Sequence, residues 1–135
     1  MRIKLIDFGS KRVPKRSHDN DAGLDVYVSR HYTIYPHETK VIPLGFGLVL
    51  PDGCAGFIFP RSSLSRQGII CQLPPIDSTY RGEVHAIVSN QSQTTFEIND
   101  GDRVGQLVIL PIVVADLVAG ELDERGAGCF GSTGR

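Results

Sequence analysis

Apolar residues in this chain recur at every second position or in short continuous runs, and helical periodicity is almost absent. Such runs predict β-strands, and turn sequences such as PDG at 51–53 and NDGD at 99–102 separate them. Many short strands at this spacing are typical of an all-β barrel or jelly roll. We expect strands at 2–8, 24–29, 40–50, 55–59, 68–72, 84–90 and 95–98, a long apolar run at 104–118, and one short helix near 62–67.

The run VGQLVILPIVVADLV at 104–118 is apolar on both faces over much of its length. A small β domain does not readily cover so much apolar surface, and exposed patches of this kind mark interaction surfaces. We therefore expect one face of the run to be buried against another subunit; an ordinary central strand is the alternative. The 135 residues suffice for one domain with a core, and no repeat or linker divides them.

The formal net charge of −1 argues against a general nucleic-acid or membrane binder, because both need a strong basic excess. Any anionic ligand must then be held by local groups. The three cysteines are odd in number and lack a CxxC spacing, which indicates reduced thiols rather than a disulfide framework or a zinc site. The first residues do not resemble a signal peptide, and no stretch approaches a membrane span. We expect a cytoplasmic protein.

Three polar stretches between the expected strands carry residues suited to phosphate chemistry. In DAGLDVYV, Asp25 opens a strand after a glycine turn. In FPRSSLS, Arg61, Ser62 and Ser63 begin the expected helix, where free N–H groups and hydroxyls attract phosphate. In PPIDSTYRGEV, Asp77 lies at a strand-to-turn junction, where a carboxylate can hold a water for attack on a phosphorus. Each stretch alone also has a structural interpretation, as an Asx-turn or a serine cap.

The ring of Tyr80, in the same stretch as Asp77, can pack against a sugar. Two further stretches add polar groups. In GDRVGQL, Gln106 enters the long apolar run. The glycines of RGAGCFGSTGR at 125–135 allow successive N–H groups to wrap an anion, although a disordered terminus is the alternative. The side chains of this tail that suit a nucleotide are Arg125, Phe130, Ser132 and Thr133.

Together and in this order, AGLD, PRSSLS, IDSTYRGE, DRVGQL and RGAGCFGSTG resemble the five motifs of the homotrimeric deoxyuridine triphosphatases (dUTPases), from Asp21 to Gly134. The resemblance implies a distorted jelly-roll barrel with one short helix, and a homotrimer with a swapped C-terminal arm. It implies Mg²⁺-dependent hydrolysis of dUTP to dUMP and pyrophosphate, which limits uracil incorporation into DNA. It also implies a barrel domain at 1–124 and a flexible flap at 125–135 that closes over a site shared by three chains.

The resemblance assigns roles to individual residues. Asp77 would activate the water that attacks the α-phosphorus, and Asp25 would hold Mg²⁺ through water. Tyr80 would pack under the deoxyribose and leave no room for a 2′-hydroxyl, while Phe130 would lie on the base. The groups that would hold the phosphates are Arg61, Ser62, Ser63, Gln106 and, from the flap, Arg125, Ser132 and Thr133.

The base-reading hairpin departs from the family pattern. In the family, backbone groups of the hairpin between the second and third motifs read the uracil edge. Here that hairpin carries Pro74 and Pro75, and proline has no N–H to donate. We therefore expect Cys71, Gln72 or Leu73 to contact the base.

Two other functions remain as alternatives. A related family of the same fold deaminates dCTP with a glutamate near the base, and this chain has no convincing counterpart of that residue. A regulator gated by nucleotide, which binds a protein partner through its flap or loops, is the other alternative and is compatible with catalysis.

Overall fold

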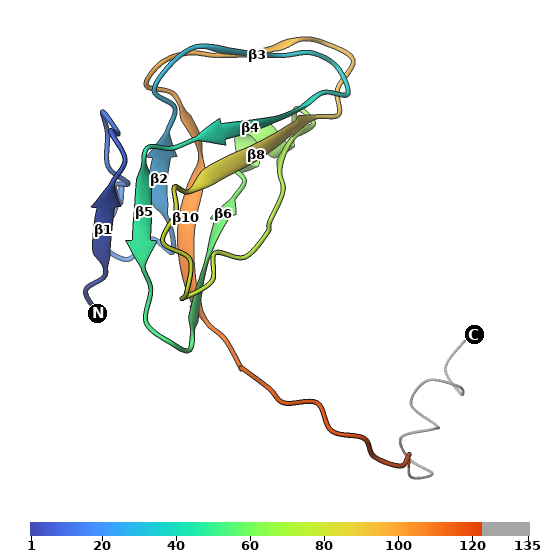
Figure 1. Cartoon of the computed structure of the whole chain (residues 1–135). Helices are drawn as coiled ribbons and strands as arrows, with labels where there is room; N and C mark the ends of the chain where they lie inside the picture. The colour runs from blue at the N-terminus through green and yellow to red at the C-terminus, as the bar shows by residue number, and fades with distance from the viewer. Residues whose placement is uncertain (123–135) are drawn as a thin grey trace.

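The computed structural model describes residues 1–122, which form a β barrel with one short helix and an extended arm (Figure 1). An all-β fold with a single short helix near 62–67 was predicted, and it is confirmed. The expected flap at 125–135 lies outside the described residues. The elements are β1 (Lys4–Asp7), β2 (Leu24–Tyr27), β3 (Tyr32–Ile34), β4 (Thr39–Pro43), β5 (Phe46–Val49), β6 (Cys54–Phe59), α1 (Ser62–Ser65), β7 (Ile69–Cys71), β8 (His85–Asn90), β9 (Phe96–Ile98) and β10 (Arg103–Pro111).

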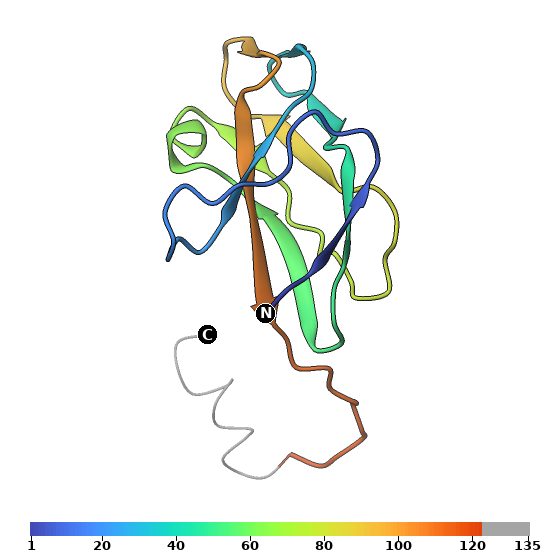
Figure 2. The same ribbon diagram turned by 90° about the vertical axis from the view of Figure 1, so that its left-hand side faces the viewer.

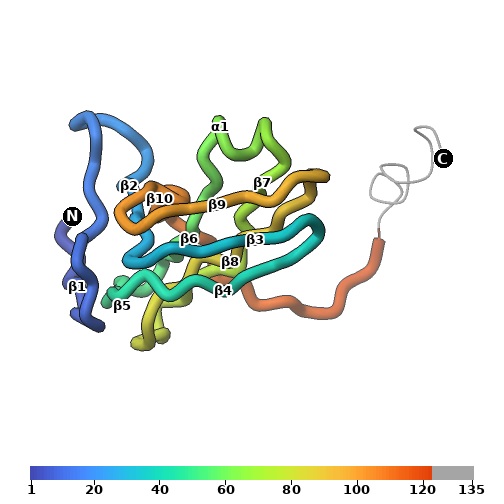
Figure 3. The backbone as a smooth tube through the Cα atoms, turned by 90° about the horizontal axis from the view of Figure 1, so that it is seen from above, coloured from blue at the N-terminus to red at the C-terminus, as the bar shows by residue number. Residues whose placement is uncertain are grey.

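Within residues 1–122 the strands pair antiparallel in four small sheets. β1 pairs with β5 and β3 with β9, while the three-stranded sheets have the orders β2-β10-β6 and β4-β8-β7. Figure 3 shows β3 and β9 side by side across the top of the barrel. Figure 2 shows β10 running along the barrel with the single turn of α1 to one side. Pairing between strands far apart in sequence brings their connecting loops together, and such loops are where sites form.

β10 positions three of the sequence motifs. Gln106 on β10 lies opposite Asp25 of β2 on one side and opposite Phe59 of β6 on the other. Phe59 is followed after one proline by Arg61 at the start of α1. The ladder of backbone hydrogen bonds therefore fixes the relative positions of Asp25, Arg61 and Gln106.

The barrel interior is apolar apart from a short polar network. Asn90 is fully buried, and its Nδ2 donates to the carbonyls of Ile34 at 2.9 Å and Thr94 at 2.8 Å. Its Oδ1 accepts hydrogen bonds from Ser92, so the amide is satisfied, as buried polar groups require. Residues 1–122 contain no helix with the length and apolarity of a membrane span.

Two strand predictions were wrong in detail, and one strand was missed. The predicted strand 40–50 divides into β4 and β5 because Gly45 adopts a φ of +78°, which turns the chain. β3 was not predicted. The run 104–118 is a strand only as far as Pro111, after which residues 112–122 leave the barrel as an exposed arm (Figure 1). At its start the arm is held to the barrel by a backbone hydrogen bond from Ile112 N–H to the Gly53 carbonyl, at 2.9 Å.

Candidate functional site

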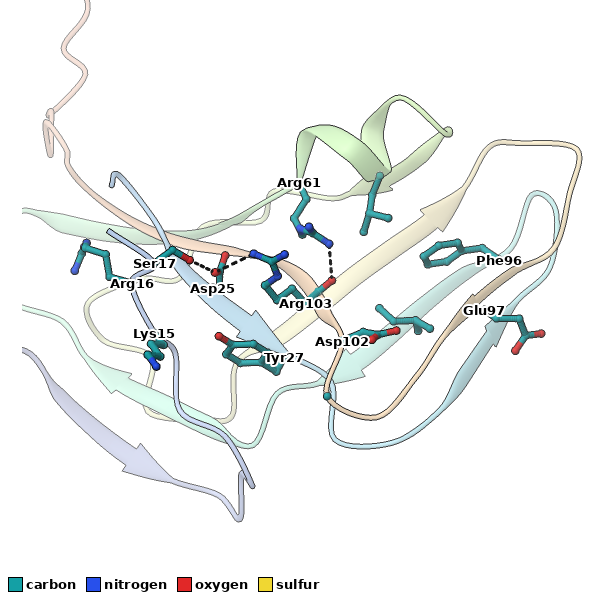
Figure 4. Close-up of a pocket in the computed structure, with 13 residues that line it drawn as sticks. Lys15, Arg16, Ser17, Asp25, Tyr27, Arg61, Phe96, Glu97, Asp102 and Arg103 are labelled. Atoms are coloured by element: carbon teal, nitrogen blue, oxygen red, sulfur yellow. Dashed lines mark hydrogen bonds and ion pairs between the residues drawn. The ribbon is translucent and has the colours of Figure 1, made fainter. Parts of the chain in front are cut away.

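A charged cleft of about 690 Å³ lies where the loop before β2, the start of α1 and the ends of β9 and β10 meet (Figure 4). We call it the basic cleft because four basic side chains outnumber three acidic ones among its lining residues. Such an excess attracts anions. The cleft is lined by Lys15, Arg16, Ser17, Asp25, Tyr27, Arg61, Leu64, Phe96, Glu97, Ile98, Gly101, Asp102 and Arg103.

Asp25 is the least exposed of the three acidic residues that line the cleft, with 18% of its side chain accessible. Ser17 Oγ donates to Asp25 Oδ2 at 2.7 Å, and Arg103 Nη1 lies 3.5 Å from the same oxygen. The loop that carries Ser17 is held by backbone bonds between Lys15 and Asp25, of 3.0 Å and 2.7 Å. Figure 4 shows both contacts converging on the carboxylate, which is therefore held in place at the cleft.

Arg61 extends into the cleft from the start of α1, as Figure 4 shows. Its Nη1 contacts the Arg103 carbonyl at 3.5 Å. Ser62 and Ser63 form the first turn of α1 and are exposed beside it. The first N–H groups of a helix have no partner within the helix, so this turn presents N–H groups and hydroxyls next to a guanidinium.

Gln106 is clamped between two neighbours at the back of this region. Its Nε2 donates to the carbonyl of Pro60 at 3.3 Å, and Pro60 directly precedes Arg61 at the start of α1. On its other side, a Cβ at Gly23 would lie 2.5 Å from Gln106 Oε1, closer than real Cβ atoms approach. The glycine of the first motif thus provides the space that the glutamine of the fourth motif occupies.

A second, more apolar cavity of about 270 Å³ lies between β6, β8 and the connection from β7 to β8, and we call it the Asp77 pocket. Asp77 and Tyr80 line it from the turn that follows Ile76, where backbone bonds of 3.0 Å and 2.7 Å join Ile76 to Gly56 of β6. The Tyr80 hydroxyl donates to the Glu83 carbonyl at 2.7 Å. The remaining lining residues are Val41, Ile58, Gln72, Pro74, Pro75, Ile76, Glu83, Val84, His85 and Ile87.

The hairpin residues expected to read a base have different environments. Cys71 is buried and its thiol points at the Val104 carbonyl, 3.7 Å away. Burial raises the pKa of Cys71 to about 11, so the thiol is neutral at ordinary pH. Gln72 lines the Asp77 pocket, and its Nε2 donates to Ser89 Oγ at 3.1 Å. Leu73 is exposed at the hairpin tip.

No residue lines both cavities, so the described part of the chain holds two separate cavities. Asp25 and Arg61 belong to the first, and Asp77 and Tyr80 to the second. Within residues 1–122, no three His, Cys, Asp or Glu side chains gather as a metal site would require. The basic cleft suits a polyanion. The Asp77 pocket suits a flat, mostly apolar group beside a carboxylate.

Sequence reasoning missed four groups of the basic cleft. The sequence assigned no role in the site to these side chains, which are Lys15, Arg16, Ser17 and Arg103. No sequence signal marks Ser17, because its contact with Asp25 depends on the path of the loop. The predicted flap residues, Arg125, Phe130, Ser132 and Thr133, lie outside the described residues.

The fold and the two cavities define a class of protein: a small β barrel that has a basic cleft and, separately, a carboxylate in a more apolar pocket. The dUTPase family profile matches residues 10–134. A deoxyuridine 5'-triphosphate nucleotidohydrolase of Tropheryma whipplei (strain Twist) is 42% identical over 131 residues, which cover 90% of this chain and 88% of that protein. One from Clostridium tetani (strain Massachusetts / E88) is 35% identical and covers 100% of this chain and 97% of that protein.

Solved structures agree. A mutant dUTPase of Staphylococcus bacteriophage 80alpha with dUpNHpp superposes with a TM-score of 0.85, at 25% identity and over 99% of both chains. The dUTPase of phage phi11 of S. aureus, in a mutant described with a structural Mg(II) ion, gives a TM-score of 0.83 at 25% identity, over 92% of this chain and 99% of that one. The chain belongs to the dUTPase family.

Proposed function

We propose that this protein hydrolyses dUTP to dUMP and pyrophosphate, at sites that the basic cleft of one copy and the Asp77 pocket of another form together. The observation that carries the proposal is the division of the family motifs between two cavities of complementary chemistry, one cationic and one apolar with a carboxylate. A nucleoside triphosphate has the matching division, since it joins a polyanion to a base and sugar. The names of the relatives specify dUTP.

Asp77 accepts the proton of the attacking water. Its carboxylate is exposed at the mouth of the pocket, where a water has access to it. The oxygen of that water forms a bond to the α-phosphorus, and the bond from that phosphorus to the bridging oxygen breaks. The electron pair leaves with pyrophosphate, and a positioned base of this kind contributes a large part of the rate.

The phosphate chain is held by charge-assisted and neutral hydrogen bonds. Arg61 offers a guanidinium fork, and Ser62 and Ser63 offer hydroxyls and N–H groups beside it. Gln106 keeps one N–H for a phosphate oxygen while the other holds the Pro60 carbonyl. From the flap we assign Arg125, Ser132 and Thr133 to the terminal phosphate and Phe130 to the base.

The residues of the basic cleft fit Mg²⁺. That ion commonly takes one or two carboxylates and keeps several waters, with substrate phosphates completing its shell. Asp25 is the one carboxylate fixed among basic groups at the phosphate side, and we assign it to the ion through water. When bound, Mg²⁺ neutralises charge on the phosphate oxygens.

Sharing of the site requires more than one copy of the chain, and from membership of the dUTPase family we infer a homotrimer in which the C-terminal arm crosses to a neighbour. Residues 112–122 expose valine and leucine side chains, with Leu117 96% accessible, and extended apolar chain of this kind needs a partner. Each copy offers a groove of about 250 Å³ beside β1, which pairs with β5 alone among the described strands. The groove is lined by Met1, Ile3, Leu5, Pro14, Arg16, Leu24, Leu48, Leu107 and Ile109.

We assign recognition of the base to the hairpin after β7. Pro74 and Pro75 line the pocket but have no N–H to offer, so the polar contacts fall to Gln72 and to the backbone of Leu73. Cys71, with its thiol buried, supports that backbone from within the barrel. Tyr80 packs under the deoxyribose and fills the volume that a 2′-hydroxyl would need.

One assay tests the reaction. The purified protein is incubated with dUTP, dCTP, dTTP or UTP in the presence of Mg²⁺, and pyrophosphate and ammonia are measured. We expect pyrophosphate from dUTP and little from the others. Ammonia from dCTP, or binding of dUTP without turnover, would overturn the proposal in favour of the deaminase or the regulator.

A further inference from the structure

The turn that carries Asp77 and Tyr80 is anchored by a carboxylate further along the chain. Glu83 Oε2 accepts the N–H of Gly45 at 2.8 Å, across 38 residues of sequence. Gly45 is itself held, because its carbonyl accepts the N–H groups of Phe8 at 2.9 Å and Ser10 at 3.1 Å. Its N–H is thus a fixed point on the barrel, to which the Glu83 side chain attaches the end of the turn.

The ring of Tyr80 depends on that end of the turn. Its hydroxyl donates to the backbone carbonyl of Glu83 at 2.7 Å, while its own N–H donates to the Asp77 carbonyl at 3.1 Å. The ring lies across Gly82, where a Cβ would be 2.5 Å from the Tyr80 hydroxyl oxygen. The tip of the ring is therefore placed by the backbone at 82–83.

We propose that Glu83 is a positioning residue for sugar selection, and this rests on the proposed role of Tyr80 under the deoxyribose. The bond from Val84 N–H to the Phe46 carbonyl holds the peptide group that contains the Glu83 carbonyl. The Glu83 carboxylate ties residue 83 to the barrel at a second point, and so holds Gly82 and the Tyr80 ring that lies across it. This keeps the ring where it excludes a 2′-hydroxyl. A displacement of about 1 Å is enough to change how well a site discriminates.

The adjoining strand does not need this carboxylate. Val84 N–H donates to the Phe46 carbonyl at 2.7 Å, and Leu44 N–H donates to the Val84 carbonyl at 3.0 Å. These backbone bonds remain when the side chain of Glu83 is removed. Truncation therefore leaves the 83–84 peptide group paired and removes only the second anchor of residue 83, which loosens the turn at 77–82 while the barrel keeps its pairing.

The test compares Glu83→Ala with Glu83→Gln by measuring kcat/KM for dUTP and for UTP. We expect the dUTP:UTP ratio to fall about tenfold in Glu83→Ala, chiefly through better use of UTP. Glu83→Gln should stay within about twofold of the native ratio, because its amide oxygen accepts the same N–H. Glu38→Ala is the matched control. The Glu38 carboxylate also accepts a backbone N–H, that of Tyr35 at 3.1 Å, but Glu38 lines neither cavity.

An unchanged ratio in Glu83→Ala, or equal losses on both nucleotides, would overturn the inference, as would a Glu83→Gln variant that behaves like Glu83→Ala. If Glu83→Ala does not fold, Tyr80→Phe removes only the hydroxyl bond to the Glu83 carbonyl, and a native ratio there would also overturn it. Native protein that shows no dUTP hydrolysis overturns the proposed function instead. The two failures are therefore distinguishable.

Discussion

The basic cleft and the Asp77 pocket are built by different means. Asp25 of the cleft is the register partner of Gln106 on the neighbouring strand, and Ser17 and Arg103 contact the same carboxylate oxygen of Asp25. In the pocket, Asp77 comes from the long connection between β7 and β8, which is tied down at a few points such as Glu83. The phosphate half is thus fixed by the sheet, while the nucleoside half depends on a few anchors.

This difference separates affinity from chemistry. A cleft rich in fixed charge supplies binding energy to the phosphates, which every nucleoside triphosphate carries. A pocket built on a turn supplies the proton acceptor and the shape that selects sugar and base. We therefore expect substitutions in the pocket to change turnover or selectivity, and substitutions in the cleft to change KM as well.

The largest effect is expected for Asp77→Asn. The amide keeps the size of the carboxylate but does not accept the proton of the water, so kcat should fall about 1000-fold. The affinity for a non-hydrolysable dUTP analogue, measured by calorimetry, should remain nearly native. A variant with native kcat would remove Asp77 from its assigned role.

Arg61→Ala, a substitution in the basic cleft, should have the next largest effect. Loss of one guanidinium that holds phosphate costs about 100-fold in kcat/KM, with KM rising. Steady-state pyrophosphate release measures both constants. A fall in kcat with an unchanged KM in Arg61→Ala would contradict the expectation that the cleft supplies binding energy and the pocket supplies the chemistry.

A mixture of these two variants tests whether the halves come from different copies. Each variant alone should be nearly inactive, whereas a co-refolded equal mixture should regain about a quarter of native activity, because random assembly pairs an intact Asp77 with an intact Arg61 at that frequency. Each variant refolded alone is the control. Activity at the mean of the two parents would mean that one chain supplies both halves.

The same contrast explains what the sequence could reveal. Short alternating runs and turn glycines sufficed for most strands, and five motifs in order sufficed for Asp25, Arg61, Asp77 and Gln106 as candidates. The break at Gly45 was not visible because the apolar run continues through it.

Contacts between segments that are distant in the sequence could not be predicted from local sequence pattern either. Ser17 reaches Asp25 only because backbone bonds between Lys15 and Asp25 hold its loop beside β2, and the Glu83 carboxylate accepts the N–H of Gly45, 38 residues away in the sequence. The end of β10 was missed because the apolar content of 112–118 does not say whether the same chain covers it. Local pattern fixes which residues form strands, whereas pairing partners and anchors depend on the completed barrel.

Gly23→Ala should weaken the cleft through packing. The added methyl would meet Gln106 Oε1, so either the glutamine or β2 must shift, at a cost of about 1–3 kcal/mol in the free energy of unfolding. Urea unfolding measures this cost, and KM for dUTP should rise with it. Gly56→Ala is the matched control, because a methyl there meets Ile76 and Leu50 at 3.4 Å and 3.5 Å, an ordinary contact.

The smallest effect concerns Cys71, at the boundary between the barrel interior and the Asp77 pocket. Because burial raises the pKa of its thiol to about 11, well above the value in an unfolded chain, the group stabilises the fold below the unfolded pKa and loses that contribution as pH rises toward 11. Between pH 8 and pH 10 the native protein should therefore lose roughly 1–2 kcal/mol more unfolding free energy than Cys71→Ala. At pH 8, iodoacetamide should modify the partly exposed Cys54 and spare Cys71 until urea is added, as peptide mass spectrometry would show. Rapid native labelling of Cys71 would instead place its thiol at the pocket wall, where it would contact a base directly.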